Sequence, residues 1–166
     1  MSFSLLPYVQ TSKLTDITKD YLNENGIRLL MMDFDNTIVP YTTNVPTREV
    51  VDWLARMRSC DVQLCVVSNS KNQRVQKFCK EHQLDCITHA KKPFPDGIRR
   101  CLGEYNIPKE ESALVGDQIF TDTLGANCAG VKSILVKAIR NHNIWLKLRH
   151  VAELPFIYLG RNRRIN

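Results

Sequence analysis

The sequence lacks the features of an exported or membrane-spanning chain. None of its 166 residues belongs to a run of eighteen apolar residues, and residues 1–10 lack the basic start and long apolar stretch of a signal peptide. Its six cysteines are scattered without a C-x-x-C pair, so neither a disulfide framework nor a zinc site is expected. We therefore expect a cytoplasmic protein whose cysteines are reduced core thiols.

Several common nucleotide and metal motifs are also missing. The sequence contains no G-x-x-x-x-G-K-[ST], no G-x-G-x-x-G and no H-E-x-x-H, and its four histidines show no metal-ligand spacing. An EF-hand loop starting at Asp33 would need glycine and glutamate where this chain has Ile38 and Asn44. The sequence therefore favours none of the protein classes that are recognised by these motifs.

Positive charge is concentrated at the C-terminal end. The net charge is +6, and residues 132–166 carry eight Lys or Arg against one acid, Glu153, so the preceding part is nearly neutral. A local excess of this kind suits an anionic partner, such as a lipid surface or nucleic acid. A tail that only improves solubility is an equally simple interpretation.

Apolar runs alternate with segments of helical periodicity along most of the chain. The expected strands are 27–32, 62–67, 86–88, 113–115 and 133–136, and the expected helices are 15–25, 47–58, 72–81, 94–105 and 121–129. This alternation predicts an α/β, Rossmann-like fold with a parallel sheet covered by helices on both faces. We expect one domain over residues 1–166, with a core at about 14–136 and a basic tail at 137–166.

Chemically active side chains follow four of the expected strands. Asp33 and Asp35 follow the first, Ser68-Asn69 the second, Lys92 the third, and Asp117 and Asp122 the fourth. In parallel sheets the carboxyl ends of the strands meet at one edge, so these groups are expected to converge. Two neighbouring carboxylates repel each other, which indicates either a bound cation or a protonated carboxyl group.

This order of motifs resembles the haloacid dehalogenase superfamily of phosphotransferases, and within it the YqeG-like phosphatases, a group related to phosphatidylglycerophosphate phosphatases. The motifs that carry the resemblance are Gly26-Ile27, Asp33-Phe34-Asp35-Asn36-Thr37, Val67-Ser68-Asn69, Ala90-Lys91-Lys92-Pro93 and Gly116-Asp117-Gln118-Ile119-Phe120-Thr121-Asp122. It extends from about Leu14 to Val136. The resemblance implies a phosphomonoester hydrolase, with phosphatidylglycerophosphate as the favoured substrate.

The resemblance also implies a role for each catalytic residue. Asp33 would attack phosphorus and form an aspartyl-phosphate, and Asp35 would act as acid and then as base. Ser68, with backbone N–H groups near Asn69, and Lys92 would bind the phosphoryl oxygens. Lys92 is preferred over Lys91 because it adjoins Pro93, as in the family motif.

A magnesium site is implied by the same motifs. Asp33, Asp117 and the backbone carbonyl of Asp35 would hold Mg²⁺, which prefers oxygen ligands. Asp122 is expected to orient Lys92 or the metal shell, and Thr37 to support the motif.

The gaps between motifs leave little room for a cap domain. Residues 38–62 can hold only a small turn or flap and one helix, and residues 70–91 one helix and a short strand. We therefore expect a capless enzyme. An open site admits bulky substrates, or it is closed by a partner subunit in a homo-oligomer.

The tail allows two interpretations. Ile144, Trp145, Leu148, Val151 and Ala152 form one helical stripe, with Lys147, Arg149 and His150 elsewhere on the helix and Arg161, Arg163 and Arg164 following. Basic residues interleaved with aromatic ones fit peripheral contact with the inner face of a membrane. A terminal helix packed on the sheet fits as well.

Three functions remain open from the sequence: a phosphatase of phospholipids, a soluble phosphatase of small metabolites or nucleotides, and a non-catalytic module that binds nucleic acid or a protein. The complete set of acids favours an enzyme, because folding does not need Asp35. The sequence shows no recognised RNA-binding motif, so no nucleic-acid partner is expected.

Overall fold

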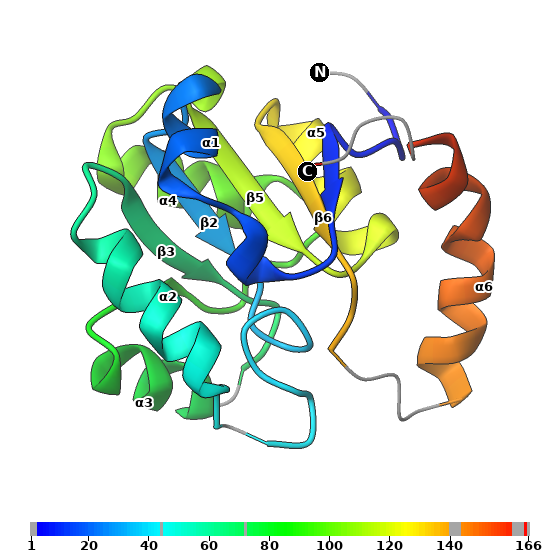
Figure 1. Cartoon of the computed structure of the whole chain (residues 1–166). Coiled ribbons are helices and arrows are strands. Elements are labelled where there is room, and N and C mark those ends of the chain that lie inside the picture. Colours follow the sequence, from blue (N-terminus) through cyan, green and yellow to red (C-terminus); the bar gives the residue numbers. More distant parts are fainter. Residues whose placement is uncertain (1–2, 44, 72, 140–143, 161–164, 166) are drawn as a thin grey trace.

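The computed structural model describes residues 3–43, 45–71, 73–139, 144–160 and 165. Its centre is one six-stranded, entirely parallel sheet with the strand order β1-β6-β5-β2-β3-β4 (Figure 1). The strands are β1 (Val9–Thr11), β2 (Leu29–Met32), β3 (Gln63–Val67), β4 (Asp85–Ile87), β5 (Ser112–Gly116) and β6 (Lys132–Val136). The predicted α/β, Rossmann-like parallel sheet is confirmed.

Helices cover both faces of the sheet because its strands are apolar on both sides. The helices are α1 (Lys19–Glu24), α2 (Arg48–Arg58), α3 (Gln73–Glu81), α4 (Asp96–Tyr105), α5 (Leu124–Ala129) and α6 (Ile144–Leu159), with short helical turns η1 (Leu14–Asp16), η2 (Lys109–Glu111) and η3 (Ile119–Thr123). Leu30 and Met32 of β2 pack in one core with α1, α2 and α3. Leu29 and Met31 pack in a second core with α4 and α5, as the twofold repeat of a strand requires.

The register of the central strands brings the predicted site residues to one edge. Met32 of β2 lies opposite Val66 of β3 and Val115 of β5. The chain therefore leaves these three strands at nearly the same level, toward Asp33 after β2, Ser68 after β3 and Asp117 after β5. This common edge places the motifs together.

Several element boundaries differ from the sequence prediction. Five strands were expected, but the structure adds the edge strand β1, which pairs with β6 and contains the polar residue Gln10. The expected helix 15–25 is the turn η1 followed by α1, because Thr18 caps a new helix by accepting a hydrogen bond from the backbone N–H of Tyr21. The helix expected from 94 begins at Asp96, and the one expected from 121 starts as the π-helical turn η3.

The segments between motifs are short, as predicted. Apart from residues 44 and 72, the described segment 38–62 contains one helix, α2, and the described segment 70–91 contains α3 and β4. No inserted cap domain lies in these described segments. The described segments therefore insert no domain over the edge that carries the motifs.

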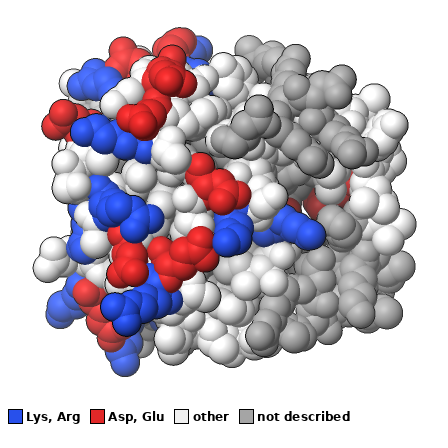
Figure 2. Space-filling view, viewed as in Figure 1, with Lys and Arg blue, Asp and Glu red and all other residues white. Residues whose placement is uncertain are grey.

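Charge is mixed on the face shown in Figure 2. Lysine and arginine side chains alternate with aspartate and glutamate side chains over the part of this face that carries α2 and α3, without a patch of one sign. Arg161, Arg163 and Arg164, which contribute much of the positive charge of the predicted basic tail, lie outside the described residues. Among the described helices, none is long and apolar enough to cross a bilayer.

Candidate active site

The chain turns tightly directly after β2. Asn36 adopts a left-handed conformation (φ 62°), which asparagine tolerates better than most residues. Its backbone N–H donates to the carbonyl of Val39 at 2.7 Å, and its side-chain oxygen accepts from the backbone N–H of Tyr41 at 3.1 Å. The turn follows Asp33 and Asp35, which flank the buried Phe34 in the sequence.

Asp33, Lys92 and Asp122 form a buried ionic cluster. The Lys92 ammonium lies 2.7 Å from a carboxylate oxygen of Asp33 and 2.7 Å from one of Asp122. All three residues are less than one tenth exposed. Buried charges are expensive unless paired, so this cluster holds three segments, 59 and 30 residues apart in the chain, in one arrangement.

Asn69 fixes the backbone of Lys92. Its side-chain amide donates to the Lys92 carbonyl at 2.8 Å and accepts from the Lys92 backbone N–H at 2.7 Å. Asn69 was predicted to bind phosphate through backbone N–H groups near it, and its side chain is committed to this contact with Lys92. Helix α3 begins only at Gln73, so the backbone near Asn69 is not the first turn of that helix. Lys91, next to Lys92, is exposed, which agrees with the choice of Lys92.

Gly116 allows Asp122 to fold back against the end of β5. A Cβ atom at position 116 would lie 2.4 Å from the Asp122 carboxyl carbon, which no side chain could accommodate. The second carboxylate oxygen of Asp122 accepts from the backbone N–H of Gln118 at 3.1 Å. The π-helical turn η3 therefore points Asp122 toward Lys92, as expected for an orienting residue.

Burial shifts the proton affinities in this cluster. It raises the pKa of Asp33 to about 6; the charge of Asp122 also raises this pKa, whereas Lys92 lowers it. Burial alone would lower the pKa of Lys92, but the charges of Asp122 and Asp33 raise it above its ordinary value. Lys92 therefore stays charged at neutral pH, and Asp33 is mostly ionised.

Three carboxylates come close enough to share a cation. Asp33, Asp117 and Asp122 each offer an oxygen, and these oxygens all lie within 4.8 Å of one another. Lys92 neutralises one of the three charges, which leaves the charge that a single Mg²⁺ would balance. Oxygen donors are the ligands that Mg²⁺ prefers, so the donor set fits this ion. The predicted use of the Asp35 backbone carbonyl stays a prediction.

Arg74 is a site residue that the sequence analysis missed. From α3 it forms an ion pair with the Asp35 carboxylate. Its guanidinium carbon lies 5.2 Å from the centre of the Phe34 ring and 5.7 Å from that of Tyr41, so the two rings hold it beside Asp35. An adjacent guanidinium favours the charged form of a carboxyl group. The one sequence feature that could have indicated Arg74 is its place in the first turn of α3, the helix that follows β3 and the site residue Ser68.

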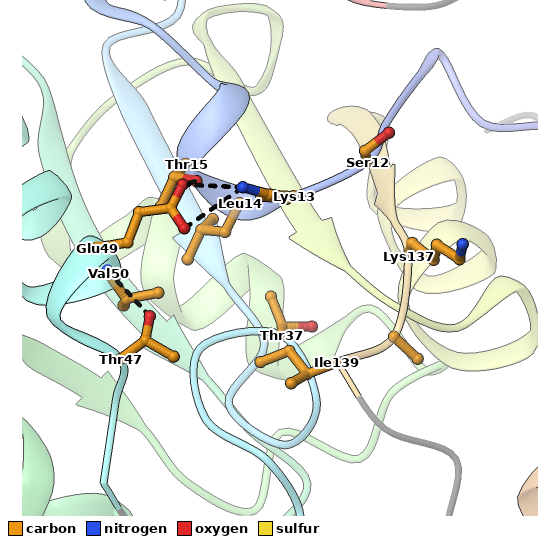
Figure 3. Close-up of a pocket in the computed structure, with 11 residues that line it drawn as sticks. Ser12, Lys13, Leu14, Thr15, Thr37, Thr47, Glu49, Val50, Lys137 and Ile139 are labelled. Carbon is orange, nitrogen blue, oxygen red and sulfur yellow. Dashed lines mark hydrogen bonds and ion pairs between the residues drawn. The ribbon is translucent and has the colours of Figure 1, made fainter.

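Ser68 and Thr37 occupy the same edge. Ser68 is buried, and its hydroxyl oxygen accepts from the backbone N–H of Ser70 at 3.1 Å, which leaves its own hydrogen available to a ligand. Thr37 is 2% exposed, and within the described part of the chain its hydroxyl has no hydrogen-bond partner. Thr37 lines a pocket beside the turn, together with Lys13, Glu49 and Ile139 (Figure 3).

Fold and site together define a class: an α/β protein with a buried lysine and a cluster of acids at the carboxyl edge of a parallel sheet, and with no cap domain inserted in the described segments between its motifs. The family model described as haloacid dehalogenase-like hydrolase matches residues 41–136. Probable phosphatase YqeG of Bacillus subtilis is 30% identical over 131 residues, which are 79% of this chain and 76% of that protein. The chain therefore belongs to the haloacid dehalogenase-like hydrolases and is a phosphoric monoester hydrolase.

Two further comparisons agree with this assignment. Glyceraldehyde 3-phosphate phosphatase of Pyrococcus abyssi is 25% identical over 124 residues, 69% of this chain but 51% of that protein. The solved structure of a haloacid dehalogenase-like hydrolase from Streptococcus pneumoniae matches with a TM-score of 0.56 at 12% identity, covering 79% of this chain and 91% of that one. The latter similarity shows the fold.

Proposed function

We propose that this chain is a Mg²⁺-dependent phosphatase that works through an aspartyl-phosphate on Asp33, and that its substrate is phosphatidylglycerophosphate. The observation that carries the mechanism is the buried cluster in which Lys92 contacts both Asp33 and Asp122 at 2.7 Å. A lysine placed in this way can neutralise a phosphoryl group as it bonds to Asp33. The substrate rests on the resemblance to YqeG-like phosphatases.

In the first half of the reaction, an oxygen of Asp33 bonds to phosphorus and the bond from phosphorus to the substrate alcohol breaks. Asp35 gives its proton to the departing oxygen, so that a neutral alcohol leaves. Ser68 and Lys92 hold the phosphoryl oxygens. Asp35, which forms an ion pair with Arg74, must take up this proton before the step.

In the second half, water attacks the phosphorus of the aspartyl-phosphate and Asp35 accepts its proton. Phosphate leaves, and Asp33 returns to its starting form. Asp33 and Asp117, with the Asp35 backbone carbonyl, would hold Mg²⁺, which would supply positive charge for the phosphoryl group. Asp122 keeps Lys92 oriented in both steps.

The basic tail is proposed to contact an anionic membrane that holds the substrate. Val151, Leu154, Tyr158 and Leu159 of α6 are exposed apolar or aromatic side chains. Val151 and Ala152, part of the predicted apolar stripe, face solvent instead of the sheet, and the side chains at 144–150 lie outside the described residues. An exposed apolar face on a helix that arginines follow in the sequence supports an interfacial role.

A soluble phosphatase of small metabolites is the second candidate, supported by the similarity to a glyceraldehyde 3-phosphate phosphatase. Phosphate release from phosphatidylglycerophosphate in mixed micelles, measured beside a panel of soluble phosphomonoesters with and without Mg²⁺, separates the two. Our proposal requires metal-dependent turnover that is fastest with the lipid. Faster turnover of a soluble metabolite would favour the second candidate, and full activity in excess chelator would exclude the metal site.

A further inference from the structure

A second pocket adjoins the acid cluster from the side of α6. It has a volume of about 400 Å³ and lies between the ends of β1 and β6 and the helix, and we call it the α6 pocket. Asp117 forms part of its inner wall, and Leu154 and Ile157 of α6 form part of its outer wall. Because Asp117 belongs to the cluster with Asp33, this pocket opens beside the proposed phosphoryl site.

Helix α6 is fixed in this position by a buried carboxylate. Glu153 is 2% exposed, and its carboxylate accepts hydrogen bonds from the backbone N–H groups of Ile119 at 3.0 Å and Phe120 at 3.3 Å. These groups begin the turn η3, which follows Asp117 closely and contains Asp122. The helix is therefore anchored directly on the segment that carries two of the site acids.

Two contacts on β1 hold the other end of the helix. The side-chain amide of Gln10 donates to the carbonyl of Ile157 at 2.8 Å. Gly160 lies so close that a Cβ atom there would be 2.5 Å from the same amide nitrogen. The outer wall of the pocket is therefore a fixed surface.

The lining combines the cation of Lys137 and the carboxylate of Asp117 with hydroxyl and apolar groups. Lys137, at the end of β6, lines the α6 pocket together with Ser12 and the apolar side chains of Leu135 and Leu154. Lys137 and Ser12 also line the other pocket, but in Figure 3 the ammonium end of Lys137 points away from Thr37 and Ile139 of that pocket. A cation beside a mixed polar and apolar wall suits an alcohol that carries a negative charge of its own.

We propose that the α6 pocket binds the leaving group of the substrate, an alcohol that carries a second anionic group recognised by Lys137. This inference rests on the proposed function, because the phosphoryl group must first bind at Asp33. The volume accommodates a glycerol unit with one phosphodiester, and it does not accommodate the acyl chains of a lipid. Helix α6 therefore covers the leaving group from one side, without an inserted cap domain.

The test compares two soluble phosphomonoesters that differ in the second charge. One is glycerophosphoglycerol phosphate, the lipid headgroup without acyl chains, and the other is glycerol 3-phosphate. We expect the wild type to have the higher kcat/KM for the first, and Lys137→Met to lower the ratio of the two values by roughly tenfold. Lys80→Met removes an exposed charge far from both pockets and should leave the ratio as it is.

A second pair of variants tests the pocket by its shape. Leu154 is 46% exposed and lines the pocket, whereas Leu159 is 66% exposed and does not. Leu154→Trp should fill the pocket without unfolding the protein, lower the ratio again and weaken product inhibition by glycerophosphoglycerol. Leu159→Trp should change neither quantity.

The outcomes separate this inference from the proposed function. The pocket assignment is overturned if the wild type shows no preference for the charged leaving group, or if both test variants keep the wild-type ratio and product inhibition. If the ratio changes as expected but the lipid itself is not hydrolysed, the pocket stands and a soluble bisphosphorylated substrate replaces the lipid. If the lipid is hydrolysed and the ratio never changes, the proposed function stands and the pocket assignment fails.

Discussion

Lys92 organises the site at the scale of single residues. Its ammonium joins two carboxylates, and its backbone is held by both polar groups of the Asn69 amide. The sequence predicted Lys92 and Asp122 because both follow strands of a parallel sheet. It did not predict the contact of Asn69 or the ion pair of Arg74, because both depend on how segments far apart in the chain meet.

The pKa of Asp33 predicts how metal affinity depends on pH. Because burial raises this pKa to about 6, protons and Mg²⁺ should compete for the carboxylate below that pH. Mg²⁺ affinity should therefore fall as pH is lowered through 6, by roughly tenfold per pH unit, while it changes little above pH 7. Isothermal titration calorimetry between pH 5 and 8 measures this directly. In Asp33→Asn, which has no carboxylate at this position, the remaining weak binding should lose this pH dependence.

At the scale of elements, apolar runs made the central strands easy to predict. β2 is apolar throughout, and β3 and β5 are apolar after their first residues, Gln63 and Ser112, because these strands are buried on both faces. β1 was missed because it is a three-residue edge strand with a polar centre, and only its pairing with β6 makes it a strand. The start of α6 was visible in the helical pattern, but its anchoring through a buried glutamate was not.

Glu153 should stabilise the fold measurably. Replacement by leucine would leave the backbone N–H groups of Ile119 and Phe120 without their acceptor, at a cost of about 1–3 kcal/mol. Glu153→Gln keeps one acceptor oxygen and should lose less. Urea unfolding measures these differences, and Glu104→Ala, at an exposed position, should change stability by no more than about 0.5 kcal/mol. A Glu153→Leu protein as stable as the wild type would show that α6 is not anchored there.

At the scale of the whole molecule, the convergence of motifs could be predicted but the surroundings could not. Parallel strand order alone brings Asp33, Ser68, Lys92 and Asp117 to one edge. The two pockets and the place of α6 depend on packing between segments more than one hundred residues apart, such as Gln10 and Ile157. Such contacts leave no local periodicity in the sequence.

The proposed membrane contact predicts a salt-sensitive association with lipid. The triple variant in which Arg161, Arg163 and Arg164 become glutamine should bind anionic vesicles more weakly, by about 1 kcal/mol per arginine at low salt. High salt should release the wild type as well. Vesicle sedimentation measures both effects, and the matched control neutralises Lys19, Lys77 and Lys80, which are exposed on α1 and α3. Equal binding by the two triple variants would exclude the tail as the contact.

The phosphorylated state of Asp33 is the most direct test of the proposed reaction. Protein mixed with substrate and Mg²⁺ is quenched in acid within milliseconds, and the phosphorylated residue is located by mass spectrometry. We predict one phosphoryl group on Asp33 that hydroxylamine removes, and none in a folded Asp33→Asn variant, which should also have no turnover. A phosphoryl group on another residue, or steady turnover by Asp33→Asn, would contradict the assignment of Asp33 as the nucleophile.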